Sequence, residues 1–296
     1  HAVTIAEDVS GMPGMCAAAE EGGVGFNYRL GMAVPDFWIK LLKEVPDEQW
    51  DIWQMWNMMT DRLPYVKTVA YCESHDQALV GDQTIAFRLM NKQMYTDMNR
   101  SAENLVIDRG MALHKLIRLF TISLAGDAYL NFMGNEFAQF IEWNYTQSLD
   151  WLLLGYEKHQ KMQHFVRTLN HFYLENRCFW ENDSDWDGFR WLSCDDRDNS
   201  IVAFRRISRK GKELIAVCNF CPVLRESYRL PLPKAGWYQP VLNTDDAQFG
   251  GYDFQPAPVH AEKDKQPQGE YAYSGVFRVP PMSVCFYKHI RNKPEK

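Results

Sequence analysis

Short apolar runs alternate with longer amphipathic stretches over roughly the first 155 residues of the chain. Runs rich in β-branched and aromatic residues predict strands, and apolar residues at helical spacing predict helices. The expected strands are Val3–Ala6, Gly25–Tyr28, Thr68–Tyr71 and Tyr129–Met133. The expected helices are Met32–Glu44, Glu48–Met59, Ile107–Ala125 and Tyr156–Glu175. Strands separated by helices indicate a parallel sheet, as in an α/β barrel, where the chemistry lies at the C-terminal ends of the strands.

From about residue 178 the pattern changes to short β-rich runs separated by turn signals. The expected strands are Gly188–Ser193, Ile201–Arg206, Glu213–Asn219, Glu226–Arg229, Trp237–Leu242, Tyr271–Val279 and Val284–Tyr287. This spacing is typical of an antiparallel β-sandwich. The segment Gln255–Gly269, rich in Pro, Gln and Lys, is expected to be a long surface loop. We therefore expect two domains, residues 1–176 and 177–296.

Composition narrows the class of protein. The net charge of −6 and the lack of Lys/Arg clusters argue against nucleic acid as a partner. No apolar stretch of about 18 residues is present, so no membrane span is expected. Seven scattered cysteines, an odd number, favour a reducing compartment such as the cytoplasm, or the plastid stroma in a plant or alga. No cofactor or metal is expected.

Two carboxylates are the most informative candidates for chemistry. Glu7 follows the apolar run Val3–Ala6, and Asp76 follows the run Thr68–Tyr71. Cleavage of a glycosidic bond requires one group that protonates the leaving oxygen and another that supports the positive charge on the sugar. The aromatic content of 14% serves mainly the core, and some Trp and Tyr are expected to line a groove in which sugar rings stack. The pattern therefore predicts a glycosidase-type site at the strand ends.

The residues around these carboxylates resemble a known family. Ala6–Gly11 together with Glu73–Gln77 resembles the α-amylase superfamily and, within it, the 1,4-α-glucan branching enzymes. Further segments with the same likeness are Gly25–Leu30, Asp76–Asp82, Phe132–Phe137, Asn243–Asp245 and Phe249–Gly251. The resemblance covers nearly the whole chain. It implies the C-terminal half of a (β/α)8 TIM barrel, holding strands five to eight, followed by an antiparallel β-sandwich.

The resemblance also implies roles for individual residues. Glu7 would be the general acid/base, and Asp76 would stabilise the transition state. His75 would hydrogen-bond the sugar in the cleavage subsite, and Tyr28 and Arg29 are further candidates for substrate binding. The alternatives are ordinary strand-end carboxylates and a histidine that caps a loop. For Glu136, which follows the last expected strand, a structural role is favoured over a catalytic one.

The family's nucleophile is an Asp on the fourth barrel strand, and no counterpart precedes Glu7. The similar segment Asp187–Leu192 is rejected because it lies far downstream, in a sandwich strand, with Leu192 where the nucleophile would be. The first residues read as a buried strand, so the chain is expected to begin at the fifth barrel strand. We therefore expect a complementary N-terminal fragment that carries the nucleophile, or self-association through open barrel edges.

The expected activity is retaining transglycosylation, which cleaves α-1,4 bonds and forms α-1,6 branches in glycogen or starch. The partners would be α-glucans such as amylose, glycogen and amylopectin. The chain alone is expected to be inactive for lack of the nucleophilic Asp. Two alternatives stay open, an α-glucan hydrolase and a non-catalytic subunit that binds α-glucan.

Overall fold

The computed structural model describes residues 2–63, 66–79, 83–183 and 186–294, which excludes Val80–Asp82 of one family-like segment. The chain forms two compact units. One comprises residues 1–50 and 54–170, and the other comprises residues 51–53 and 171–296. The domain division expected after residue 176 lies just past the end of α7 (Glu157–Glu175).

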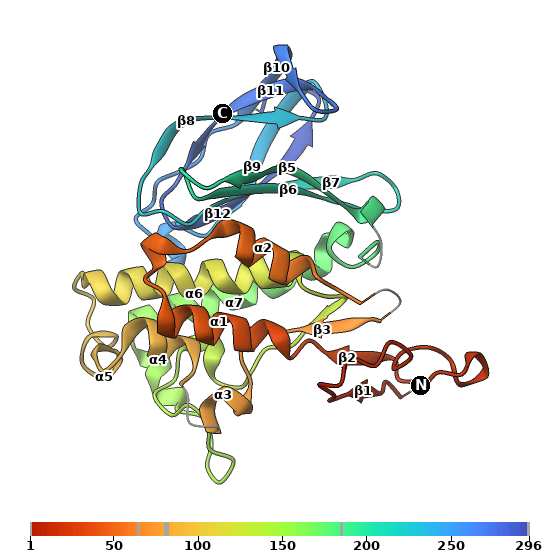
Figure 1. The fold of residues 1–296 in the computed structure, drawn as a ribbon. Helices are drawn as coiled ribbons and strands as arrows, with labels where there is room; N and C mark the ends of the chain where they lie inside the picture. The colour runs from red at the N-terminus through yellow and green to blue at the C-terminus, as the bar shows by residue number, and fades with distance from the viewer. Residues whose placement is uncertain (1, 64–65, 80–82, 184–185, 295–296) are drawn as a thin grey trace. The chain divides into compact units, whose positions relative to one another are not determined.

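The first unit contains a small parallel sheet (Figure 1). Its strands are β1 (Ile5–Ala6), β2 (Tyr28–Leu30), β3 (Thr68–Ala70) and β4 (Ala128–Tyr129), in the order β1-β2-β3-β4. All three pairings are parallel, so the partial α/β barrel expected from the sequence is confirmed. Among the described residues, β1 and β4 each have one neighbouring strand and therefore one open edge.

The expected helices of the first unit are present. They are α1 (Ala33–Glu44), α2 (Ile52–Thr60), α6 (Leu105–Leu124) and α7 (Glu157–Glu175). The structure adds three short helices, α3 (His75–Leu79), α4 (Ile85–Met90) and α5 (Gln93–Asp97), and the 3₁₀ turns η1 (Ala19–Glu21), η2 (Asp47–Gln49), η3 (Asn135–Phe137) and η4 (Trp151–Gly155). The expected helix Glu48–Met59 is divided because Trp50 has an extended backbone between η2 and α2.

Local side-chain chemistry fixes where α6 starts. The Asn104 side chain accepts hydrogen bonds from the backbone N–H groups of Val106 and Ile107, at 3.0 and 3.1 Å. These two groups have no carbonyl partner inside the helix, and an Asn cap satisfies them. The helix therefore begins two residues before the expected Ile107.

The helical layer packs around Trp38 of α1, which is fully buried. Its Nε1–H donates to Thr121 Oγ1 of α6 at 2.8 Å, and its ring centroid lies 6.4 Å from those of Trp50 and Phe120. A buried indole needs such a partner for its N–H. This one hydrogen bond joins α1 and α6, which also appear as neighbouring helices in Figure 1.

The second unit is the expected antiparallel β-sandwich. Its strands are β5 (Phe189–Asp196), β6 (Ile201–Ile207), β7 (Glu213–Asn219), β8 (Arg225–Leu232), β9 (Gly236–Asn243), β10 (Val259–Gln268), β11 (Tyr271–Val279) and β12 (Ser283–Ile290). They follow the order β5-β6-β7-β12-β9-β10-β11-β8, and every pairing is antiparallel. All eight strands contribute to one buried apolar cluster, which confirms the sandwich.

Two expectations from the sequence are wrong. Gln255–Gly269 is not a loop over most of its length, because β10 occupies Val259–Gln268. Its first residues pair with β9 and later ones with β11, and these distant partners supply hydrogen bonds that the polar composition does not reveal. The first strand is not buried either. Val3 and Ile5 are 64% and 48% exposed, because β1 is the edge strand of the sheet.

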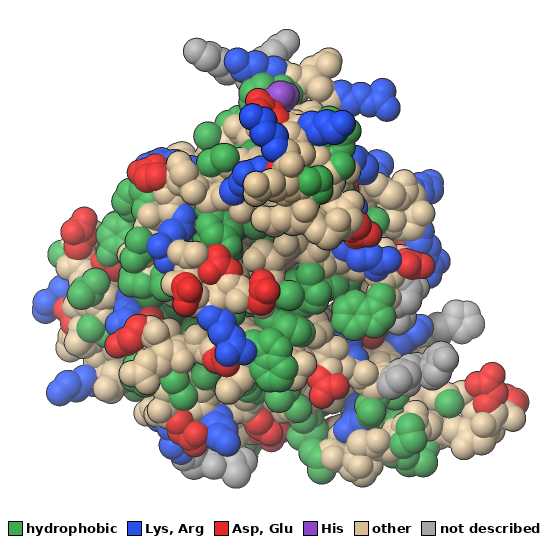
Figure 2. Space-filling view, turned by 45° about the horizontal axis from the view of Figure 1, so that its top comes forward, with side chains coloured by type: hydrophobic (Ala, Val, Ile, Leu, Met, Phe, Trp, Pro, Cys, Tyr) green, Lys and Arg blue, Asp and Glu red, His purple; other side chains and the backbone are tan. Residues whose placement is uncertain are grey.

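The described surface shows mixed charge. Lys and Arg side chains are interspersed with Asp and Glu over most of the face seen in Figure 2. None of the described helices is long and apolar enough to cross a membrane. All seven cysteines are free thiols.

We predict that Gly126→Ala destabilises the first unit. A Cβ at this position would lie 2.6 Å from the Thr68 carbonyl oxygen and 2.9 Å from the Ala70 nitrogen, both in the backbone of β3. Backbone atoms of a strand cannot move aside cheaply, so we expect a loss of about 1–3 kcal/mol in the free energy of unfolding.

Chemical denaturation followed by circular dichroism measures this loss. Gly155→Ala is the matched control, because nothing lies within 4 Å of a Cβ there. Equal stability of the two variants would contradict the close contact between Gly126 and β3.

Candidate active site

The two predicted catalytic carboxylates lie at the same edge of the parallel sheet. Glu7 directly follows β1, and the segment carrying Asp76 follows β3. The register pairs Ala6, the last residue of β1, with Arg29, and Arg29 with Thr68, the first residue of β3, so the parallel strands end at the same side of the sheet but β3 extends two residues beyond β1. Side chains that follow these strands therefore project from one edge of the sheet.

The structure brings three of the five predicted residues together. One oxygen of Glu7, one ring nitrogen of His75 and one oxygen of Asp76 all lie within 4.8 Å of one another. The closest measured contact joins His75 Nε2 and Asp76 Oδ1, at 3.4 Å. The His75 side chain is 50% exposed and that of Asp76 is 34% exposed. The cluster is therefore open to a ligand from solvent.

Hydrogen bonds around Ser74 hold the turn that presents His75 and Asp76. The Asp76 N–H donates to Ser74 Oγ at 3.2 Å, and the Ser74 N–H donates to Gln77 Oε1 at 2.8 Å. The Gln77 amide in turn donates to Asp36 Oδ1 of α1 at 3.2 Å. The start of α3 is thus tied to itself and to a longer helix, which restricts the positions of both site residues.

Tyr28 and Arg29, the two residues predicted to bind substrate, are neighbours on β2 and point to opposite faces of the sheet. Successive side chains of a strand point to opposite faces, so the two cannot line one surface. Arg29 Nε donates to the Asp8 carbonyl at 3.0 Å, next to Glu7. Among the described contacts, none joins Tyr28 to the cluster. Arg29 therefore steadies the chain beside Glu7, and a substrate-binding role for Tyr28 stays a prediction.

Tyr71 lies close to the negative charges of the site and was not predicted from the sequence. Its side chain is buried. Burial raises the pKa of Tyr71 above its ordinary value, and the negative charges of Asp76, Asp36 and Glu7 raise it further. The phenol therefore stays protonated, and the carboxylates together create a negative potential at the end of β3.

A second group missed by sequence reasoning is the buried carboxylate of Glu73. It accepts hydrogen bonds from the Ile85 N–H at 2.6 Å and from Asn135 Nδ2 at 3.0 Å, and His114 Nε2 lies 3.8 Å away. Burial alone would raise the pKa of Glu73, but these contacts and the charge of Arg118 outweigh it, so the pKa is lowered. The carboxylate is ionised and connects the end of β3 to α4, α6 and η3.

His114 and Arg118 complete this buried network. His114 is buried on α6. Burial lowers the pKa of His114, against the effect of the Glu73 hydrogen bond, and the charge of Arg118 lowers it further. Arg118 donates to Asn131 Oδ1 at 2.9 Å and to the Asn135 carbonyl at 3.4 Å. The His114 ring therefore sits between the buried Glu73 carboxylate and the buried Arg118 guanidinium.

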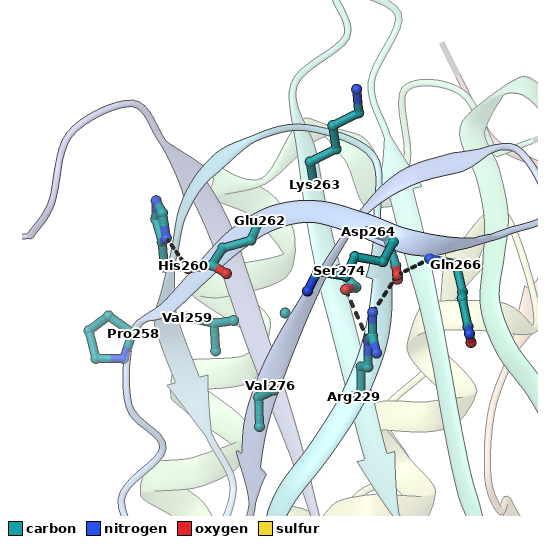
Figure 3. A pocket seen from close by; sticks show the side chains of 12 residues that line it. Arg229, Pro258, Val259, His260, Glu262, Lys263, Asp264, Gln266, Ser274 and Val276 are labelled. Atoms are coloured by element: carbon teal, nitrogen blue, oxygen red, sulfur yellow. Dashed lines mark hydrogen bonds and ion pairs between the residues drawn. The ribbon is translucent and has the colours of Figure 1, made fainter.

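Two cavities lie away from the carboxylate cluster. One of about 350 Å³ in the first unit is lined by the charged residues Arg29, Asp36, Asp61 and Arg62, by Thr68 and by mostly apolar residues. The other, of about 710 Å³, lies in the sandwich along β8, β10 and β11 (Figure 3). There Arg229 joins Asp264 and Ser274, and the Asp264 carboxylate also accepts from the Gln266 N–H. Neither of these two cavities is lined by Glu7, His75 or Asp76.

The same cluster is the one group of three potential metal ligands found among the described residues. Each residue offers one donor atom, so a divalent ion would need two carboxylates and one imidazole. Carboxylates that protonate a leaving group or stabilise a cation act without a metal. The cluster is therefore interpreted as an acid/base site.

Comparison with known proteins agrees with this fold. Residues 191–290 match the family described as "Alpha amylase, C-terminal all-beta domain". The crystal structure of an α-amylase from H. orenii superposes with a TM-score of 0.50 and 14% identity, covering 97% of this chain and 53% of that chain. A Group B Streptococcus pullulanase superposes with a TM-score of 0.53 and 12% identity, covering 88% and 39%. The fold is thus that of the α-amylase class.

The chain is similar to 1,4-alpha-glucan-branching enzymes over most of its length, which confirms the resemblance. The enzyme of Yarrowia lipolytica is 41% identical, over 88% of this chain and 38% of the relative. That of Candida glabrata is 45% identical, over 85% and 36%. That of Dictyostelium discoideum is 38% identical, over 97% and 43%. The chain spans about two fifths of the length of these relatives.

We predict that the stability of the chain falls as the pH drops below about 6.5, the ordinary pKa of histidine. The pKa of His114 is lowered in the folded chain, so as the pH falls the unfolded chain takes up this proton at a higher pH than the folded chain does. Proton uptake then stabilises the unfolded state relative to the folded state, and the free energy of unfolding falls. The pKa of Glu73 is also lowered in the folded chain. Protonation of this carboxylate therefore reduces the free energy of unfolding further when the pH falls below 4.5, the ordinary pKa of glutamate. Denaturation midpoints measured from about pH 8 to pH 5 record the slope.

The variant His114→Gln isolates this contribution. It cannot take up the proton, so its stability is expected to depend less steeply on pH, whatever its absolute value. The exposed His171 provides the control variant His171→Gln, which should keep the original slope. An unchanged slope in His114→Gln would show that His114 does not carry the effect.

Proposed function

We propose that this chain forms part of the active site of a 1,4-α-glucan branching enzyme. In this proposal Glu7 is the general acid/base, Asp76 stabilises the transition state and His75 hydrogen-bonds the sugar. The observation that carries it is the meeting of these three side chains, within 4.8 Å, at the ends of two parallel strands. The similarity to branching enzymes over most of the chain supports the choice of reaction.

Branching transfers a glucan chain to another sugar rather than to water, so we propose a mechanism with retention that holds the sugar covalently and then transfers it. In such a mechanism a carboxylate nucleophile attacks the anomeric carbon while the general acid protonates the leaving oxygen. Oxygens of Glu7 and Asp76 lie within 4.8 Å of each other. Asp76 is therefore close enough to act on the sugar that Glu7 protonates.

The proposed reaction has two displacements. In the first, a carboxylate nucleophile bonds to the anomeric carbon, the bond from that carbon to the leaving O4 breaks, and Glu7 gives its proton to O4. In the second, ionised Glu7 takes the proton of a 6-hydroxyl, whose oxygen bonds to the anomeric carbon as the carboxylate leaves. Asp76 remains ionised beside the oxocarbenium-like states. The product is an α-1,6 branch.

We propose that the nucleophile comes from residues outside the described cluster. Among the described residues, Glu7, His75 and Asp76 form the one cluster of this kind, and it holds no third carboxylate. The open edges of β1 and β4 and the exposed Val3 and Ile5 offer a place for additional strands. We propose that a complementary N-terminal fragment binds there and brings the nucleophile. Pairing of two copies through the same edges is the alternative.

A non-catalytic role is the second candidate function. The absence of a third carboxylate from the described cluster favours a subunit that binds α-glucan without cleaving it. Binding of maltoheptaose with no turnover, in the presence of the N-terminal portion, would support this candidate. An α-glucan hydrolase would instead generate reducing ends, whereas branching conserves their number.

We predict that Glu7→Gln lowers branching by about 10²–10⁴-fold, because glutamine cannot transfer the proton in either step. Asp76→Asn removes the negative charge beside the sugar and is expected to cause a comparable loss. The measurement is the fall in iodine colour of amylose without new reducing ends, in a preparation that contains the nucleophile.

Glu20→Gln is the matched control, because Glu20 is exposed in the same N-terminal segment but lies outside the cluster. It should keep full activity. Near-normal branching by Glu7→Gln would show that Glu7 is not the general acid/base.

A further inference from the structure

The turn that carries Asp76 is held by one buried amide side chain. Gln77, directly after Asp76, is 7% exposed. Its Oε1 accepts hydrogen bonds from the Ser74 N–H at 2.8 Å and from Ser74 Oγ at 3.3 Å. Its Nε2 donates to Asp36 Oδ1 of α1 at 3.2 Å. The Asp76 N–H donates to the same Ser74 hydroxyl, at 3.2 Å, so Asp76 depends on the group that Gln77 holds.

These contacts form one continuous chain of hydrogen bonds from Asp76 to a carboxylate on α1. The Asp76 N–H donates to Ser74 Oγ, and this hydroxyl donates to Gln77 Oε1. The amide of Gln77 then donates to Asp36. Every donor points in the same direction along the chain, and hydrogen bonds ordered in this way polarise and strengthen one another. The chain ends on a carboxylate, which is a stronger acceptor than a neutral oxygen.

An amide suits the position of Gln77 better than a charged side chain does. The side chain must accept from Ser74 with one atom and donate to Asp36 with the other. An ionised glutamate has no donor and would face Asp36 with the same sign of charge, and a lysine has no acceptor for Ser74. A buried polar group that loses its partner is costly. Both neighbours of Gln77 therefore specify an amide.

The support beside the other proposed catalytic carboxylate comes from the same part of the chain. Arg29 of β2 donates from Nε to the Asp8 carbonyl at 3.0 Å, directly after Glu7. Asp36 follows a few residues later, in the first turn of α1. Both Arg29 and Asp36 also line the cavity of about 350 Å³. The short segment from the end of β2 to the start of α1 therefore supports the backbone beside Glu7 and beside Asp76.

We propose that Gln77 and Asp36 are positioning residues for Asp76. This inference rests on the proposed function, and the two residues act through Asp76 rather than on the sugar. A carboxylate stabilises the positive charge of the transition state only when it lies at the correct place, and a misplacement of about 1 Å can lower a rate about 10²-fold. The hydrogen-bond chain fixes Asp76 to α1, which Trp38 in turn anchors to α6.

The test is branching of amylose by Gln77→Glu, in a preparation that contains the nucleophile. Repulsion from Asp36 should displace the turn, so we expect kcat to fall about 10- to 100-fold with a smaller change in KM, because Asp76 acts in the transition state. Combining Gln77→Glu with Asp36→Asn exchanges donor and acceptor and restores the contact, so most of kcat should return. Gln54→Glu makes the same change of charge at an exposed position of α2 and should branch like the original chain.

Hydrogen exchange of the chain alone provides a second measurement, which needs no nucleophile. The amide hydrogens of Ser74 and Asp76 both donate within the turn. They should exchange faster in Gln77→Glu and slow again in the double variant, because loss of these hydrogen bonds opens the turn locally. Unchanged exchange in Gln77→Glu would overturn the positioning role.

The outcomes separate this inference from the function on which it rests. If the original preparation branches amylose and Gln77→Glu branches equally well, the positioning role is overturned and the proposed function stands. If the original preparation does not branch, the proposed function fails, and the exchange rates still decide whether Gln77 holds Asp76. Should Gln77→Glu not fold, as seen by circular dichroism, Asp36→Ala removes the last acceptor of the chain at an exposed position. It should lower kcat severalfold, and full activity would overturn the inference.

Discussion

The buried carboxylate of Glu73 is the interaction on which the proposed site depends. An ionised group inside a protein is tolerated only when its oxygens are hydrogen-bonded and its charge is balanced. Glu73 meets both conditions through Ile85, Asn135 and the nearby Arg118. These partners come from three separate elements, so one side chain fixes the end of β3 against all of them. His75 and Asp76 begin immediately after this fixed point.

Parallel pairing explains why residues about seventy positions apart share one edge. The strand β2 joins β1 and β3 in one direction, although each of these strands has only two or three residues. Such short ladders provide few hydrogen bonds, so packing must supply most of the stability. The helical layer around Trp38 and α6 does so on one side. The exposed side chains of β1 show that the described residues give this edge no comparable cover.

The sequence predicts the fold well where hydrophobic periodicity is strong. The expected helices are present, one of them divided at Trp50, and the seven expected sandwich strands are confirmed. The strand-end rule selects Glu7 and Asp76, which the structure brings together and whose roles stay proposals. Prediction from the sequence fails for β10, because this strand is formed by hydrogen bonds to β9 and β11 that its own composition does not reveal. It also misses Glu73, which looks like an ordinary residue of a polar segment. Its partner Asn135 is 62 residues away, and such a distant contact leaves no local pattern.

The openness of the carboxylate cluster has a physical interpretation. Small molecules are usually held in enclosed pockets that bury most of their surface, and the two cavities described above do not contain Glu7 or Asp76. A polymer cannot enter such a pocket, because its chain must extend on both sides of the reacting bond. An exposed edge with half-exposed His75 meets that requirement. The exposure of Glu7 and His75 therefore suits the polymeric substrate proposed above.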